Sequence, residues 1–156
     1  MINNIIFLDI DGVLNSDKFF EESEYCNRSD INSPLYDIDM NKLELLLDVV
    51  RETSSSIVIT SSWRRLSIYP YVKKYLIDKG LPIIHETSYI EGKRGEEIRD
   101  YLNNNDVDNF VILDDEVFSD FNELTNYLVK TNFYEDGLTI DNCNEIKKRL
   151  IKERRN

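Results

Sequence analysis

IIFLDIDGVLN, the stretch from Ile5 to Asn15, decides the fold of this chain. Four apolar residues run directly into Asp9 and Asp11, and Gly12 follows. A strand that is apolar at every position is typical of a parallel sheet buried on both faces. Such a strand ends at the carboxyl edge of its sheet, where open α/β folds bind ligands. We therefore expect the two aspartates to lie at a ligand site.

The spacing of the two aspartates has a chemical consequence. On an extended strand, positions 9 and 11 face the same side. We expect the chain to turn after Asp9, where Gly12 makes such a turn easy, so that both carboxylates reach one ligand. Carboxylates that converge at a strand end repel each other unless a cation lies between them. The pair therefore predicts a hard, oxygen-preferring ion such as Mg²⁺.

Length and composition restrict the class of protein. The 156 residues are 41% hydrophobic and 31% charged, which indicates one globular domain over residues 1–156. No apolar run approaches the roughly 20 residues of a membrane span, and no signal-peptide pattern is present, so we expect no membrane partner. Cys26 and Cys143 lack metal-ligand spacing, which favours free thiols in a reducing cytoplasm. His85 is the only histidine, which argues against serine–histidine hydrolases.

The net charge of −11 restricts the substrates. An acidic surface repels nucleic acid, so we expect no extended nucleic-acid footprint. A phosphorylated small molecule or a nucleic-acid end remains compatible with this charge. Any phosphate site must then be built locally from backbone N–H groups, a metal ion and a few basic side chains.

Residues 16–38 show no clear periodicity and are too short for a separate cap domain. We expect a loop or small flap over the site. Its aromatic residues either pack onto the core or stack on a substrate base, and packing is favoured. They are Phe19, Phe20, Tyr25 and Tyr36.

A second polar strand end follows an amphipathic helix that begins after Asp39. The strand Ile57–Ile59 leads into Thr60, Ser61, Ser62, Trp63 and Arg64. A hydroxyl at a strand tip suits a phosphate oxygen. Ser61 is the first choice and Thr60 the alternative, because the register is open. Arg64 either offers a fork of donors to a phosphate or forms a surface salt bridge. Trp63 is expected to be a packing residue.

Two further segments carry charge at the ends of expected elements. Lys93 and Arg94 open a helix, where positive charge opposes the helix dipole and indicates an anion nearby. The apolar run 109–113 ends in Asp114 and Asp115. With Asp9 and Asp11 these acids would make four clustered carboxylates, which again requires a divalent ion.

Strands and helices alternate along the chain, which predicts an α/β fold. Short strands are expected at 81–84 and 127–131, the first near the sheet edge because of Pro82. Helices are expected with Pro70 in the first turn, after Gly92, and after a cap at Thr139 or Asp141. We predict a three-layer, Rossmann-like domain with a mainly parallel sheet of about five strands and a minimal cap.

These segments, in this order, resemble the four motifs of the haloacid dehalogenase (HAD) superfamily. The resemblance implies that Asp9 attacks phosphorus, while Asp11 protonates the leaving oxygen and later activates water. It implies phosphate binding by Ser61 or Thr60 and by Lys93 or Arg94. It implies Mg²⁺ held by Asp9, by Asp114 or Asp115, and by the backbone carbonyl of Asp11.

The segments around 59–64, 94–98 and 128–139 are similar to the small capless HAD domains attached to Swiss army knife RNA repair proteins. The motifs account for nearly all of these 156 residues, and no part of them resembles a ligase or kinase domain. The resemblance implies an Mg²⁺-dependent phosphomonoester hydrolase that forms an aspartyl-phosphate, acting on nucleotides or nucleic-acid ends. The alternatives are a phosphotransferase of the same superfamily and a phosphate- or metal-binding module without turnover.

Overall fold

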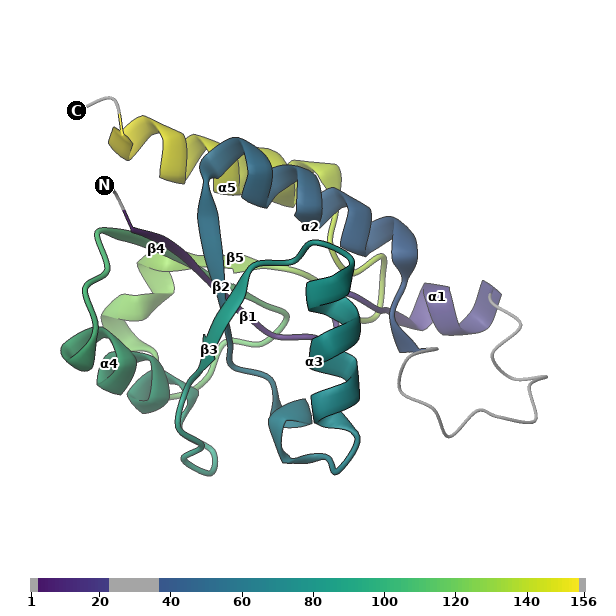
Figure 1. Cartoon of the computed structure of the whole chain (residues 1–156), viewed down its shortest axis with the longest axis horizontal. Coiled ribbons are helices and arrows are strands. Elements are labelled where there is room, and N and C mark those ends of the chain that lie inside the picture. The colour runs from purple at the N-terminus through teal and green to yellow at the C-terminus, as the bar shows by residue number, and fades with distance from the viewer. Residues whose placement is uncertain (1–2, 23–36, 155–156) are drawn as a thin grey trace.

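The computed structural model describes residues 3–22 and 37–154, and its centre is a parallel sheet (Figure 1). Five strands lie in the order β3-β2-β1-β4-β5. They are β1 (Asn4–Leu8), β2 (Ser55–Ile59), β3 (Ile83–Glu86), β4 (Asn109–Asp114) and β5 (Leu128–Lys130). All four neighbouring pairs are parallel, which confirms the predicted sheet and puts the first strand at its centre.

Helices cover both faces of this sheet in the described part of the chain. They are α1 (Asp17–Glu22), α2 (Met40–Thr53), α3 (Tyr69–Asp78), α4 (Arg94–Asn104) and α5 (Ile140–Arg154), with the 3₁₀ helices η3 (Ser62–Arg65) and η4 (Asn122–Tyr127). The larger core cluster joins α2, α3 and α5 to the sheet, and the smaller cluster joins α4 and η4 to the other face. Figure 1 shows α2 and α5 side by side on one face, with α4 apart from them. The predicted three-layer architecture is confirmed.

The central position of β1 explains why its apolar run has no polar interruption. Ile6 and Leu8 belong to the larger core cluster, whereas Ile5 and Phe7 belong to the smaller one. Side chains alternate along a strand, so both faces of β1 are buried between helices. Every residue of β1 is buried. The strand therefore carries the motif at its end into the middle of the carboxyl edge.

Local signals set the ends of the first long helix as expected. The Asp39 carboxylate accepts a hydrogen bond from the Asn41 amide at 3.0 Å, which caps α2. Ser54 ends the helix in the left-handed conformation, with φ of 51°. The chain then enters β2 directly.

The third strand lies two residues later than predicted. The Leu81 amide still donates to the Leu76 carbonyl at 3.0 Å, so Leu81 is bonded to the last turn of α3 and not to the sheet. Pro82 has no N–H, and only its carbonyl takes part in the sheet, accepting from Ile57 at 2.8 Å. The strand therefore begins at Ile83, and β3 is an edge strand as the proline indicated.

The segment 16–38 is described at its two ends. Residues 17–22 form α1, where the Asp17 amide donates to the Phe133 carbonyl at 2.8 Å. The rings of Phe20 and Phe133 lie 6.3 Å apart, so this aromatic residue packs on the turn that follows β5. Tyr25, Tyr36 and Cys26 lie outside the described residues. A flap over the site stays a prediction.

Two other features of the described residues bear on the class of protein. Cys143 is a buried free thiol in α5. None of the described helices has both the length and the apolar character that crossing a membrane requires.

Candidate active site

Three neighbouring strands end at one edge of the sheet, each in a buried polar residue. The ladder continues past the strand ends, from the Asp9 amide to the Leu113 carbonyl (3.0 Å) and from the Thr60 amide to the Leu8 carbonyl (2.9 Å). Alternation along each strand then turns Asp9, Thr60 and Asp114 toward the face that α4 covers. Thr60 and Asp114 are fully buried and Asp9 is 8% exposed.

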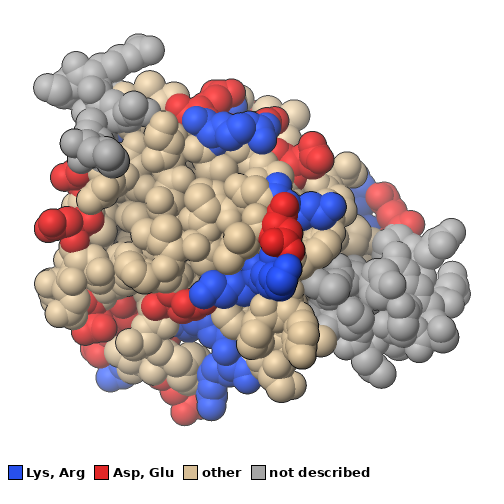
Figure 2. Space-filling view, in the orientation of Figure 1, with Lys and Arg blue, Asp and Glu red and all other residues tan. Residues whose placement is uncertain are grey.

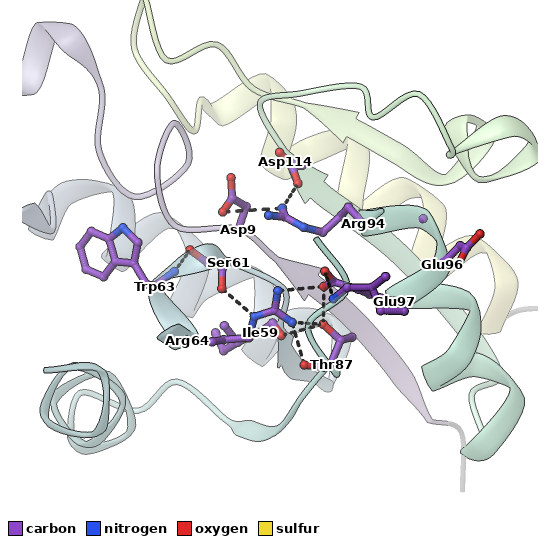
Figure 3. A network of polar contacts seen from close by, with 12 residues as sticks. Asp9, Ile59, Ser61, Trp63, Arg64, Thr87, Arg94, Glu96, Glu97 and Asp114 are labelled. Atoms are coloured by element: carbon purple, nitrogen blue, oxygen red, sulfur yellow. Dashed lines mark hydrogen bonds and ion pairs between the residues drawn. The ribbon is translucent and has the colours of Figure 1, made fainter. Parts of the chain in front are cut away.

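Three carboxylates gather at this edge. Asp9, Asp114 and Asp115 each offer an oxygen, and these oxygens lie within 4.8 Å of one another. Arg94 reaches in from the start of α4, with its Nη1 2.7 Å from Asp114 Oδ2 and 3.9 Å from Asp9 Oδ1 (Figure 3). One arginine therefore faces three acids, and the cluster carries a net negative charge when all of them are ionised.

The pKa values of two of these carboxyls reflect their surroundings. Burial raises the pKa of Asp9 from 3.8 to about 6, against the opposing charge of Arg94. Burial, followed by the negative charge of Asp9, raises the pKa of Asp114 from 3.8 to about 9. The cluster therefore binds either a proton or an added cation at neutral pH, which is the electrostatic condition for a divalent metal site.

The turn after β1 brings Asp115 against the motif. The amides of Val13 and Leu14 both donate to the Ile10 carbonyl, which closes the turn. Gly12 has φ of +81°, and a Cβ at this position would collide with the Asp115 carboxylate. The glycine predicted to allow the turn also leaves the space that Asp115 fills.

Asp11 lies in different surroundings from Asp9. Its side chain is exposed and is not one of the three clustered carboxylates. Asp11 Oδ2 accepts a hydrogen bond from Trp63 Nε1 at 2.9 Å, and Asp11 Oδ1 accepts one from Asn15 Nδ2 at 3.0 Å. Two N–H donors thus hold this carboxylate from two segments of the chain.

The two hydroxyls after β2 differ in their partners. Ser61 is the N-cap of η3, and its Oγ accepts from the Trp63 amide at 3.2 Å. The Thr60 hydroxyl is buried and has no hydrogen-bond partner among the described residues. A buried hydroxyl without a partner is costly, so Thr60 is a strong candidate to donate to a bound group. Both residues remain candidates for phosphate binding.

Arg64 forms a buried network with protein acceptors (Figure 3). Its Nε donates to the Ser61 carbonyl at 2.7 Å, and its Nη1 donates to the carbonyl and hydroxyl of Thr87 at 2.7 and 2.5 Å. Its Nη2 forms an ion pair with Glu97 at 2.8 Å. The network ties η3 to the end of β3 and to α4. The predicted contact of Arg64 with phosphate remains untested.

The two basic residues at the start of α4 lie in different surroundings. Lys93 is exposed, whereas Arg94 is buried at the acid cluster. The amides of Gly95 and Glu96 donate to the two carboxylate oxygens of Asp120, each at 2.9 Å. The protein therefore supplies its own anion in front of this helix, and Asp120 is the capping residue.

Four residues of this region escaped the sequence analysis or were assigned another role. Trp63 was expected only to pack, and Asn15, Glu97 and Asp120 were not singled out. Trp63, Glu97 and Asp120 act through partners that are distant in the sequence. Asn15 acts within a turn whose geometry depends on several residues. Asn15 and Trp63 do adjoin the two polar strand ends, and this proximity was the available signal.

A cavity of about 470 Å³ lies elsewhere, at the start of β4. It is lined in part by Phe110, Tyr127, Lys148 and Arg149. Phe110 lies four residues before Asp114, which separates this cavity from the acid cluster by most of a strand. The chemistry of the clustered carboxylates, rather than cavity size, identifies the candidate active site.

The central first strand, the acid cluster and Arg94 at the carboxyl edge define the class of protein as a HAD-type α/β domain. A family model described as the HAD domain in Swiss Army Knife RNA repair proteins matches residues 5–143. The chain belongs to this family. A search of curated proteins gave no match, and neither did a search of solved structures. Family membership supports phosphatase or hydrolase activity of the HAD type.

Proposed function

We propose that this protein is an Mg²⁺-dependent phosphomonoester hydrolase that forms an aspartyl-phosphate on Asp9. The observation that carries the proposal is the contrast between its two motif aspartates. Asp9 is buried beside Arg94 and two further acids, whereas Asp11 is exposed and held apart by N–H donors. One carboxylate is thus placed to meet an electrophile, and the other to exchange protons with solvent or a leaving group.

The acid cluster fits a divalent metal ion. Its three converging carboxylate oxygens are the ligand type that Mg²⁺ prefers, and only Arg94 offsets their charge among the contacts described. Asp9, Asp114 or Asp115 and the backbone carbonyl of Asp11 would hold the ion. When bound, Mg²⁺ would neutralise phosphoryl oxygens and the acid cluster.

The chain's own residues then account for the chemistry. A carboxylate oxygen of Asp9 attacks phosphorus, the bond to the ester oxygen breaks, and that oxygen takes a proton from Asp11. Asp11 next accepts a proton from water, whose oxygen attacks the phosphorus of the aspartyl-phosphate. The bond between phosphorus and Asp9 breaks, which releases phosphate, restores the Asp9 carboxylate and leaves Asp11 protonated for the next cycle. The net reaction is ester plus water to alcohol plus phosphate.

Several groups are available to hold the transferring phosphoryl group. We propose that Arg94 and the Thr60 hydroxyl contact it, because both face the side of the edge where Asp9 lies. Ser61 and Lys93 remain further candidates. Arg64 is proposed to position this edge rather than to bind phosphate, because its donors already have protein acceptors.

The proposed substrates are phosphorylated small molecules or nucleic-acid ends. Figure 2 shows basic and acidic side chains interspersed on one face, between broad areas without charge, rather than a continuous basic stripe. This distribution and the net charge of −11 favour contact with a terminus or a nucleotide over a long footprint.

The test is phosphate release with and without Mg²⁺. The substrates are an aryl phosphate, nucleoside monophosphates, and oligonucleotides phosphorylated at the 5′ or the 3′ end. Asp9→Asn should lose at least about 1,000-fold in kcat, because the shape is kept and the nucleophile is removed. Asp78→Asn, at an exposed ion pair on α3, is the matched control and should retain activity.

The outcomes separate the alternatives. Turnover by Asp9→Asn equal to that of the wild type would contradict the proposal. Phosphate transfer to an added alcohol in preference to water would assign a phosphotransferase. Mg²⁺ binding without release from any substrate would favour a binding module.

A further inference from the structure

We propose that Trp63 is a positioning residue that holds Asp11 in place for proton transfer. The inference rests on the proposed function, in which Asp11 protonates the leaving oxygen. It assigns a catalytic consequence to a side chain that the sequence indicated only as a packing residue.

Trp63 and Asn15 contact the two oxygens of the Asp11 carboxylate. Trp63 Nε1 donates to Asp11 Oδ2 at 2.9 Å, across 52 residues of sequence. The indole N–H is a donor only, and so is the Asn15 Nδ2 group that holds the other oxygen. Both bonds therefore favour one orientation of the carboxylate, with an oxygen directed at each donor.

The indole ring that donates this hydrogen bond is held by packing. Asp11 is exposed, so the packing of its own side chain does little to fix its rotamer. Trp63 is only 6% exposed and belongs to the larger core cluster. It also lies in η3, which follows β2 and the candidate phosphate-binding hydroxyls. A buried ring thus sets the position of an exposed carboxylate relative to the neighbouring strand end.

Proton transfer from Asp11 requires this position. General acid catalysis requires the proton to lie within hydrogen-bond reach of the leaving oxygen. The benefit is large when the leaving group is an alkoxide and small when it is a stable phenolate. A residue that positions Asp11 should therefore matter for alkyl esters much more than for activated aryl esters. A residue that merely supports the fold should affect both esters equally.

The experiment compares an alkyl phosphate with 4-nitrophenyl phosphate under saturating Mg²⁺. Trp63→Phe should lower kcat about 10- to 100-fold on the alkyl ester and less than about threefold on the aryl ester. Tyr69→Phe is the matched control, because it removes a hydrogen bond to Glu86 from another aromatic residue of the same core cluster. It should show no difference between the two esters.

A subtler replacement removes the concern that Trp63→Phe disturbs folding. The chain contains a single tryptophan, so biosynthetic replacement of tryptophan by benzothienylalanine changes only position 63. This analogue keeps the shape of the ring and exchanges the N–H for sulfur. It should reproduce the selective loss on the alkyl ester.

A spectroscopic measurement tests the contact without relying on turnover. Asp11→Ala removes the acceptor of the indole N–H and should shift the fluorescence emission of the single tryptophan, whereas Asp9→Asn should not. Unchanged emission in Asp11→Ala would overturn the contact.

The kinetic outcomes are distinguishable from failure of the proposed function. An equal loss on both esters, in the variant and in the benzothienylalanine protein, would overturn the role of Trp63 and leave the phosphatase standing. Absence of Mg²⁺-dependent release by the wild type from either ester would overturn the phosphatase and this role with it.

Discussion

Asp9 and Asp11 show how far two positions of one motif can differ at the scale of the residue. Asp9 continues the alternation of β1 and is buried with two other acids. Asp11 falls in the turn after the strand and is exposed. The raised pKa of Asp9 and the paired donors on Asp11 follow from these positions. The local backbone, rather than the residue type, separates their chemistry.

The metal-free protein should lose stability as the pH rises. The pKa values of Asp9 and Asp114 are higher in the folded state than the ordinary value of 3.8, so the folded state binds more protons above pH 4. The contribution of these two carboxyls to the stability of the folded state is fully present below that pH. It falls as the pH rises through about 6 for Asp9 and on toward about 9 for Asp114.

Thermal unfolding in a chelator at several pH values measures this effect. Asp114→Asn should unfold at a higher temperature than the wild type at pH 8 without metal. Mg²⁺ should raise the unfolding temperature of the wild type and have less effect on the variant. A wild-type stability that rises between pH 5 and 8 in chelator would contradict the assignment.

Gly12 should be required for the acid cluster. Gly12→Ala places a Cβ against the Asp115 carboxylate and forces a non-glycine residue to a φ of +81°. We expect Mg²⁺ affinity to fall about 10-fold or more, because Asp115 must move. Gly92→Ala is the matched control, since φ there is +69° but no atom lies within 4 Å of the added carbon. Equal effects on Mg²⁺ binding in a calorimetric titration would refute the role of the clash.

At the scale of the element, a buried ion pair joins the pieces that form the site. Arg64 in η3 and Glu97 in α4 have side chains only 6% and 3% exposed. Glu97 also accepts hydrogen bonds from the Thr87 hydroxyl and the Ile90 amide. The pair therefore ties the segment after β2 to the helix that carries Arg94, with the loop after β3 between them.

Removing one partner of this pair should be costly. Glu97→Gln leaves the Arg64 guanidinium buried without its counter-charge, and we expect a loss of about 3 kcal/mol in the free energy of unfolding. Lys74→Met breaks an exposed ion pair with Asp78 and should change it by less than about 1 kcal/mol. Urea unfolding measures the free energy of unfolding of both variants. A loss in Glu97→Gln no larger than in Lys74→Met would show that the network is not a structural link.

At the scale of the whole molecule, charge opposes an extended nucleic-acid partner. The net charge is −11, while the candidate site contains a local cation in Arg94. Long-range repulsion and short-range attraction therefore act on the same phosphorylated end. Salt screens the long-range repulsion more than the short-range attraction, because buried contacts are shielded from ions.

This balance predicts the salt dependence on an oligonucleotide substrate. We expect kcat/KM for a terminally phosphorylated oligonucleotide to stay level or to rise from about 25 to 200 mM NaCl, because repulsion is screened. An aryl phosphate serves as the comparison, and its kcat/KM should change less with salt. A steep fall with salt, as seen when many phosphates are contacted, would contradict the small footprint.

Local patterns determined much of this protein from its sequence alone. Apolar runs ending in acids, the cap at Asp39 and the proline before β3 each act within a few residues. Because parallel strands share one carboxyl edge, the same patterns predicted that Asp9, Asp11, Asp114 and Asp115 would cluster there, with Ser61 or Thr60 beside them. The fold class followed from these short-range rules. They also predicted an acid cluster, but with Asp11 in it, and the structure brings together only Asp9, Asp114 and Asp115.

The tertiary structure alone decided the partners of the charged and polar groups. Trp63 bonds Asp11, Arg64 pairs with Glu97, and Asp120 caps α4, over separations of 52, 33 and at least 24 residues. Several donors and acceptors along the chain could have satisfied each group equally well. Only the packing of helices on the sheet brings one particular partner within hydrogen-bond distance and excludes the others.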